Sequence, residues 1–303
     1  MASVRSRRRT IRPPGPVDLG LTLGPVVRGH TDPTARLAGG ELWRATRTPD
    51  GPATERVRAE SGAIRVTAWG PGAGWLCEHA SELVGGADDP SAFTPRHDVL
   101  RELHRRHPGL RLGRTGAVVE ALVPSVLEQK IAGKEARLNF RALVRAHGEP
   151  APGPGGLFLP PDPATLAALP SWAYHPLGIE RRRADVIRRA CGSARRIEEA
   201  AALPFPEASR RLRTFPGVGV WTAAEVARVA LGDPDAVSAG DYHLKHQVAW
   251  VLAGEPRGTD ERMLELLEPY RGQRGRAVRL IELSGLGPPR RGPRRPLRNI
   301  ARI

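Results

Sequence analysis

The chain has 303 residues, and its 47 lysines and arginines outnumber its 32 aspartates and glutamates, which leaves a formal net charge of +15. This length allows one large domain or roughly two to three smaller ones with ample hydrophobic core. The positive charge favours a polyanionic partner, with nucleic acid ahead of an acidic membrane surface. The two cysteines, Cys77 and Cys191, exclude a disulfide framework and a four-cysteine zinc or iron–sulfur centre.

Both ends of the chain are rich in arginine. Residues 1–16 read as a disordered basic arm, and residues 288–303 read as a basic tail of proline and arginine. Solvated charge is the simplest role for both, and loose contact with phosphate is the alternative. No apolar stretch approaches the length of about twenty residues that crosses a bilayer, and no signal-peptide core follows the N-terminal arginines. We therefore expect a soluble, monomeric, cytoplasmic protein without a membrane partner.

Residues 17–112 predict an N-terminal α/β domain with an antiparallel sheet. Strands are expected at residues 17–27, 41–47, 56–60 and 63–69, with a hairpin turn at Ser61-Gly62. Residues 74–83 predict a helix that covers one side of the sheet. The pattern turns helical from Thr94 onward, and this first helix is expected to stop at Pro108-Gly109.

Residues 113–287 predict an all-α core, so the fold class of the whole chain is α+β. Residues 116–148 have the spacing of two helices with a break near Gly133, and Pro124 is expected to kink the first of them. Asp162 before Pro163 is typical of the start of a short helix. Further helices are expected from Asp241 to about residue 253, at residues 259–267 and at residues 276–283.

The segment around residues 215–219 organises the helical part of the chain. Pro216 disfavours continuation of the preceding helix, and Gly217 and Gly219 permit backbone conformations that are closed to other residues. Such a turn presents bare N–H groups at the start of the next helix, where the helix dipole is positive. It is therefore a candidate phosphate site, although a plain turn between two core helices has the same pattern.

The sequence FPGVGVWTA at residues 215–223 resembles the hairpin of the helix-hairpin-helix DNA glycosylases, and most of all that of the 3-methyladenine DNA glycosylase II (AlkA-like) branch. In this superfamily an aspartate follows the hairpin at the start of a helix, and Asp241 occupies that place. Residues 100–112, 119–136, 177–187 and 268–271 extend the resemblance over roughly residues 97–286.

The resemblance implies a monofunctional DNA glycosylase of base excision repair, which acts on double-stranded DNA. Such an enzyme hydrolyses the N-glycosidic bond of a flipped, damaged purine, here expected to be alkylated, and leaves an abasic site. Asp241 is the implied catalytic carboxylate, because the sugar develops positive charge in the transition state. The same aspartate has the position of an ordinary helix N-cap.

Two other functions stay open at this point. Relatives that also cut the strand carry a lysine at the position of Trp221, so a lyase is disfavoured. A non-catalytic helix-hairpin-helix DNA-binding protein is the main alternative. We expect no cofactor and no catalytic metal, since Asp241, His243 and His246 do not share a helical face.

The resemblance also assigns residues to the DNA backbone and to the vacated base stack. Backbone contacts are expected from the hairpin residues Thr214, Gly217, Val218 and Gly219, with the glycine amides on phosphate. A monovalent cation is expected at the carbonyl groups of Arg213, Phe215 and Val218. The residue that wedges into the stack is Gln129 or Lys130, or else lies elsewhere, since an apolar residue fits that role best.

The expected base pocket is formed by Trp221, Glu225, Tyr242 and Glu282. Two of these positions, Glu225 and Glu282, correspond to aromatic residues in the resembled branch. Electron-rich rings would attract a cationic alkylated base through cation–π contact. The two carboxylates would instead attract such a base by charge, or form hydrogen bonds with a different, neutral lesion.

Overall fold

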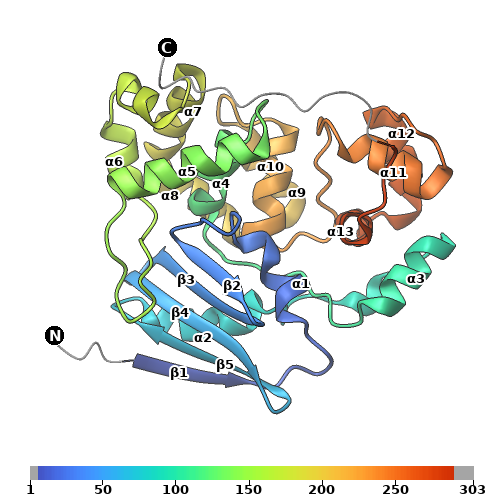
Figure 1. Ribbon diagram of the computed structural model, residues 1–303, viewed down its shortest axis with the longest axis horizontal. Coiled ribbons are helices and arrows are strands. Elements are labelled where there is room, and N and C mark those ends of the chain that lie inside the picture. Colours follow the sequence, from blue (N-terminus) through green and yellow to red (C-terminus); the bar gives the residue numbers. More distant parts are fainter. Residues whose placement is uncertain (1–5, 290–303) are drawn as a thin grey trace.

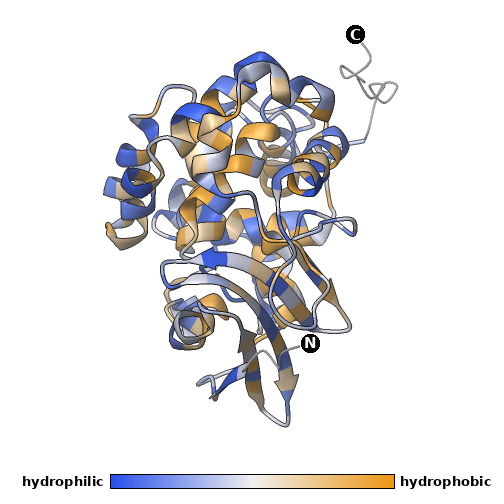
Figure 2. Cartoon of the chain, turned by 90° about the vertical axis from the view of Figure 1, so that its left-hand side faces the viewer, coloured by the Kyte–Doolittle hydropathy of each residue, from blue (hydrophilic) through white to orange (hydrophobic). Residues whose placement is uncertain are grey.

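The computed structural model describes residues 6–289, which form a five-stranded antiparallel sheet and a larger helical part (Figure 1). This arrangement confirms the predicted α+β class. Most helices and strands in Figure 2 carry both hydrophobic and hydrophilic bands, as expected of elements that bury one face. Among the described residues, no helix is long and apolar enough to cross a membrane.

The sheet has the strand order β1-β5-β4-β3-β2. Its strands are β1 (Ser6–Ile11), β2 (Ala35–Ala38), β3 (Glu41–Thr48), β4 (Gly51–Glu60) and β5 (Ala63–Trp69). Leu42, Val57 and Val66 stand opposite one another on the buried face, which helix α2 (Ala73–Leu83) covers. The predicted hairpin turn is present, because Ser61 and Gly62 both adopt positive φ angles between β4 and β5.

The prediction of a disordered arm is wrong for β1. This strand pairs antiparallel with β5 along its whole length, and Arg9 donates hydrogen bonds to the carbonyl groups of Cys77 and Glu78. Strand pairing uses backbone groups, so a run of arginines on an exposed edge does not prevent it. Residues 1–5 of the predicted arm, and residues 290–303 of the predicted tail, lie outside the described part of the chain.

The prediction of a strand at residues 17–27 is also wrong. Its place is taken by a short helix, α1 (Leu19–Leu23), and a 3-10 turn at Gly24–Val26. The side chain of Asp18 accepts a hydrogen bond from the Leu21 amide at 2.9 Å, which caps the helix. A local capping contact therefore outweighs the apolar pattern of this segment.

The remaining helices follow the expected order with small shifts at their ends. They are α3 (Asp98–Arg106), α4 (Val118–Leu127), α5 (Gly133–His147), α6 (Pro163–Ala168), α7 (Arg181–Cys191), α8 (Ala194–Glu198), α9 (Phe205–Arg213), α10 (Val220–Val226), α11 (Leu244–Ala253), α12 (Asp260–Leu267) and α13 (Arg274–Ser284). Short 3-10 turns lie at Pro90–Ala92, Ser171–Leu177, Glu199–Ala202 and Glu268–Tyr270, and a π-helical turn at Ala227–Leu231 extends α10.

These helices form two hydrophobic cores. The first core joins α4, α5, α7, α9 and α10, and the second joins α3 to α11, α12 and α13. Leu100 and Leu103 of α3 belong to the second core, in which α3 packs against α13. The predicted domain boundary at residue 112 is therefore misplaced for α3, since an apolar helix face does not reveal which partner it covers.

The sheet is fastened to the first helical core through α4. Glu120 of α4 accepts hydrogen bonds from the Thr46 hydroxyl and the Arg47 amide of β3, both at 2.7 Å. These contacts, together with the ion pair between Arg276 of α13 and Asp88, hold both helical cores against the N-terminal part. The hairpin lies between α9 and α10 of the first core. Asp241 lies in the segment that leads from the first core to α11 of the second core.

Candidate active site

The hairpin occupies residues 214–219, between the end of α9 and the start of α10. The Val218 amide donates to the carbonyl group of Phe215 at 3.0 Å and closes the turn. Gly217 has a φ of +92°, and a Cβ atom there would lie 2.3 Å from Cγ2 of Val186. This position therefore requires glycine both for its conformation and for its close packing on α7.

The amides of Gly217 and Gly219 are available to a ligand. Both residues are exposed, and neither N–H group donates to an acceptor within residues 6–289. The free N–H groups at the start of α10 adjoin them, and such a set of donors suits an anion. The Val218 amide is not free, because the turn already uses its N–H group. The Thr214 hydroxyl is exposed and donates to the carbonyl group of Arg211 at 2.8 Å.

The three carbonyl groups assigned to a monovalent cation differ in their present bonds. That of Phe215 accepts the bond from Val218, whereas those of Arg213 and Val218 accept none within the described residues. Carbonyl oxygens are the ligands that hard cations prefer, and each oxygen has two lone pairs. The donor set therefore suits such a cation.

Asp241 is fixed by backbone contacts on both sides. Its Oδ1 atom accepts hydrogen bonds from the amides of His243 at 2.7 Å and Leu244 at 2.8 Å. The helix α11 thus begins at Leu244 and not at Asp241, because the aspartate acts as its cap. Its Oδ2 atom accepts no hydrogen bond within residues 6–289, and the side chain is half-buried. One carboxylate oxygen is held in place while the other is free.

Glu225 lies close to the loop that carries Asp241. The buried Ser238 donates its hydroxyl hydrogen bond to Oε1 of Glu225, and its carbonyl group accepts the Asp241 amide at 3.1 Å. Glu225 is one helical turn after the half-buried Trp221 on α10. Ser238 therefore links Glu225, one of the predicted pocket residues, to the backbone of Asp241.

Arg228 connects the two glutamates of the predicted pocket. Its Nη1 atom lies 3.1 Å from Oε1 of Glu225, and its Nη2 atom lies 2.8 Å from Oε2 of Glu282. Burial opposes the charge of Arg228, but Glu282 and Glu225 outweigh burial and raise its pKa, so the guanidinium stays cationic. Sequence reasoning missed this arginine, although its position three residues after Glu225 signals a helical ion pair.

The fourth pocket residue, Tyr242, does not line an enclosed space. Its side chain is 70% exposed and makes edge contacts with His243 and His246. The amides of the two residues that follow it are engaged by Asp241. Tyr242 therefore lies at the protein surface.

The two wedge candidates have different environments. The Gln129 side chain donates to the carbonyl oxygen of Gly217 and to the Thr222 hydroxyl, both at 2.9 Å. The carbonyl group of Gln129 accepts a bond from the buried Arg183 at 3.1 Å. These bonds engage Gln129 in the protein, so it is not a free wedge. Lys130 is exposed and has a φ of +59°, which directs the loop outward.

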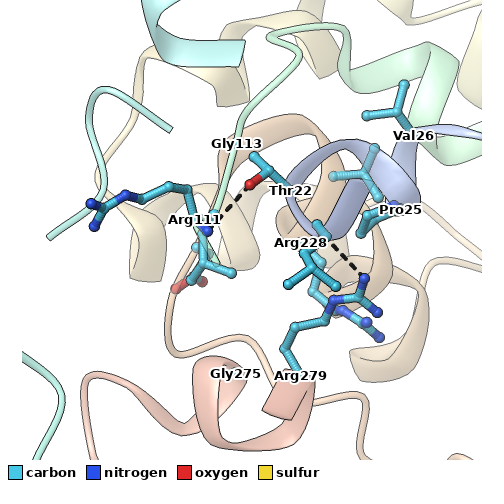
Figure 3. Close-up of a pocket in the computed structure, with 12 residues that line it drawn as sticks. Thr22, Pro25, Val26, Arg111, Gly113, Arg228, Gly275 and Arg279 are labelled. Carbon is cyan, nitrogen blue, oxygen red and sulfur yellow. Dashed lines mark hydrogen bonds between the residues drawn. The ribbon is translucent and has the colours of Figure 1, made fainter. Parts of the chain in front are cut away.

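A small cavity lies behind Arg228, toward the N-terminal part (Figure 3). Thr22, Arg228 and Arg279 are among its lining residues, and its volume is about 30 Å³. This volume holds water and not a nucleobase. Within the described residues, no group of three or more histidine, cysteine, aspartate or glutamate side chains could hold a metal ion.

A hairpin with free amides, followed by an aspartate that is held by backbone amides, is the arrangement that the resemblance to the helix-hairpin-helix DNA glycosylases leads us to expect. The structure is similar to that of a 3-methyladenine DNA glycosylase from Archaeoglobus fulgidus, with a TM-score of 0.75, 20% identity and coverage of 91% of this chain and 98% of the other. At this identity the likeness shows the fold.

Two sequence relatives are also named for DNA repair. A Mycobacterium tuberculosis protein, named a probable bifunctional transcriptional activator/DNA repair enzyme AlkA, is 31% identical over 148 residues, which cover 48% of this chain and 30% of the relative. DNA-3-methyladenine glycosylase 2 of Escherichia coli is 27% identical over 168 residues, which cover 54% and 59%. The matches thus span less than two thirds of either relative.

No protein-family model matches the chain. The fold and the relatives together nevertheless agree with the resemblance of the hairpin. The chain is therefore similar in fold and in part of its sequence to the helix-hairpin-helix DNA glycosylase superfamily, including its AlkA-like branch.

Proposed function

We propose that this protein is a monofunctional DNA glycosylase that removes a damaged purine, with alkylated purines as the class that the resemblance favours. The observation that carries the proposal is the state of Asp241. Two backbone amides hold one carboxylate oxygen, and the other oxygen accepts no hydrogen bond within the described residues. A fixed carboxylate with one free oxygen is what hydrolysis of a flipped nucleotide needs, and the free amides of the hairpin would bind the phosphate backbone of the same duplex.

The proposed reaction is a hydrolysis at C1′ of the deoxyribose. The bond between C1′ and the base nitrogen breaks, and its electron pair leaves with the base. The carboxylate of Asp241 stabilises the positive charge on the sugar, and water forms the new bond to C1′. Asp241 takes a proton from that water, and the proton is passed to the released base. The products are a free base and an abasic site.

The hairpin would position the duplex in this reaction. The amides of Gly217 and Gly219 would donate to one phosphate, and a cation at the adjacent carbonyl groups would neutralise its charge. Exposed arginines on α7, α8 and α9 surround this side of the fold and favour the same polyanion; they are Arg181, Arg182, Arg189, Arg195, Arg196, Arg210 and Arg213. Damaged double-stranded DNA is thus the proposed partner of a monomeric, cytoplasmic enzyme.

The test is base release from duplexes with single methylated, deaminated or etheno purines, followed by alkaline cleavage at abasic sites. The proposal expects release of at least one base and strand breaks that depend on alkali. Breaks without alkali would identify a lyase, against the placement of Trp221. Tight duplex binding without release of any base would favour the non-catalytic DNA-binding protein.

A further inference from the structure

The charged residues of the base pocket form a bridge between the two helical cores. Glu225 and Arg228 come from α10 and the π-helical turn that follows it, and Glu282 comes from α13. The side chains of Arg228, Glu225 and Glu282 are 19%, 17% and 27% exposed. They are therefore largely withdrawn from bulk water, although part of each side chain stays accessible.

The bridge is close to electrically neutral. Glu282 also lies 3.5 Å from Nη1 of Arg279, so two glutamates face two guanidinium groups. A purine with a fixed positive charge would gain no net attraction from this set. Neither glutamate position offers an aromatic ring for a cation–π contact, and the Arg228 guanidinium would repel a cationic base.

The bridge still has unused hydrogen-bonding groups. An arginine side chain has five N–H donors, and two of those of Arg228 are engaged within the described residues. Oε2 of Glu225 and Oε1 of Glu282 accept no hydrogen bond there. Free donors and free acceptors thus lie side by side. A base edge that carries an N–H group next to a carbonyl group needs this arrangement for its recognition.

The chemistry of the leaving group also favours a neutral purine as the substrate. A purine with a fixed positive charge leaves as a neutral molecule and needs no help from a cation. A neutral purine leaves with the electron pair of the broken C1′–N bond, so it becomes an anion until it receives the proton released by the attacking water. A guanidinium beside that base stabilises the negative charge as it develops.

We infer that Arg228, held between Glu225 and Glu282, is a specificity-determining residue that selects a neutral purine lesion over a purine with a fixed positive charge. This inference rests on the proposed glycosylase function and names its substrate class. Hypoxanthine is a suitable neutral probe, because its ring N–H group adjoins a carbonyl group. The cationic probe is 7-methylguanine.

The experiment measures single-turnover release of each base from otherwise identical duplexes, expressed as the enhancement over spontaneous release. The wild type should show an enhancement at least about tenfold larger for hypoxanthine than for 7-methylguanine. Arg228→Met retains the apolar stem and loses the donors. It should reduce hypoxanthine release by about 10- to 100-fold and change 7-methylguanine release by less than about threefold.

A second variant should change the ratio of hypoxanthine to 7-methylguanine release in the opposite direction. Glu282→Gln keeps the size of the side chain and a carbonyl oxygen for Arg228, but it leaves the pocket with a net positive charge. The ratio of hypoxanthine to 7-methylguanine release should therefore rise. Because the two variants shift the ratio in opposite directions, a general loss of stability cannot imitate the result.

The matched control is Arg262 of α12, which lies between Glu255 at 2.7 Å and Glu265 at 2.8 Å and forms no hydrogen bond or ion pair with Glu225, Arg228 or Glu282 within the described residues. Arg262→Met should leave the ratio unchanged. Release of 7-methylguanine with the larger enhancement, or the same ratio in Arg228→Met and wild type, would overturn the inference and leave the glycosylase proposal standing. Release of neither base by the wild type would overturn the inference, and the lesion panel above would then decide the glycosylase proposal separately.

Discussion

The side-chain amide of Gln129 donates to the carbonyl oxygen of Gly217 at 2.9 Å and so ties the α4–α5 loop to the hairpin. The same amide group reaches the Thr222 hydroxyl in the first turn of α10. Arg183 of α7 holds the backbone of Gln129 from the other side. The loop that carries exposed Lys130 therefore has a defined position relative to the hairpin.

Gln129→Ala should loosen this connection. The variant removes two hydrogen bonds, so we expect the free energy of unfolding to fall by about 1–2 kcal/mol. Lys130→Ala is the matched comparison, because Lys130 is exposed and its removal should change stability by less than about 0.5 kcal/mol. If Lys130 enters the vacated stack, its variant should lose base release at unchanged stability. Urea unfolding and base-release assays on both variants check this, and equal stability losses would contradict it.

Asp241→Asn tests the carboxylate without disturbing the helix cap. An asparagine oxygen can still accept the amides of His243 and Leu244, so the variant should unfold at a similar temperature and bind DNA as the wild type does. Loss of the negative charge should reduce base release by about 100-fold or more. Undiminished release in a folded Asp241→Asn protein would remove Asp241 from the catalytic assignment.

Gly219→Ala tests the approach of the DNA backbone to the hairpin. A Cβ atom at Gly219 meets nothing within 4 Å, and its φ of −90° suits alanine. Stability should therefore change by less than about 0.5 kcal/mol, whereas a methyl group between the turn and a phosphate should weaken duplex binding about tenfold. Fluorescence anisotropy with an abasic duplex measures the affinity. Wild-type affinity would argue against phosphate contact at this amide.

Gly217→Ala provides the contrast within the same turn. Its φ of +92° and the 2.3 Å approach to Val186 mean that alanine is both strained and crowded. We expect a loss of about 2–4 kcal/mol in the free energy of unfolding. A thermal melt close to that of Gly219→Ala would show that the hairpin is more adaptable than its packing implies.

Glu198 should make stability depend on pH. Burial raises its pKa from 4.5 to about 7, against the opposing effect of the Val119 and Val118 amides that donate to it. The folded state then binds more protons than the unfolded state between these two values, so this stabilising contribution is present at low pH and is lost as pH rises through about 7. The difference corresponds to at most about 3.4 kcal/mol.

The measurement is urea unfolding at pH 5 and pH 8 for the wild type and Glu198→Gln. The variant should lose much of the decrease in stability between the two pH values, because glutamine does not ionise. Glu199→Gln is the control, since Glu199 is exposed and forms an ion pair with Arg211. Identical pH dependence in all three proteins would contradict the prediction for Glu198.

Local chemistry made much of this protein predictable from its sequence. The hairpin around Gly217, the capping role of Asp241 and the turn at Ser61-Gly62 each depend on residues that are close together in the chain. Alternation and helical spacing likewise located most strands and helices, because these periods follow from backbone geometry. The resemblance of the hairpin also agrees with the fold and with the relatives that match part of the chain.

Contacts between distant segments were decided only by the tertiary structure. Nothing local shows that the arginines of β1 lie on a paired edge strand, or that α3 packs on the C-terminal helices. The bridge from Glu225 through Arg228 to Glu282 spans residues more than fifty positions apart. Sequence spacing constrains neighbours along one element, whereas the partner across a core depends on how whole elements pack. The pocket chemistry of this protein is therefore a property of its fold.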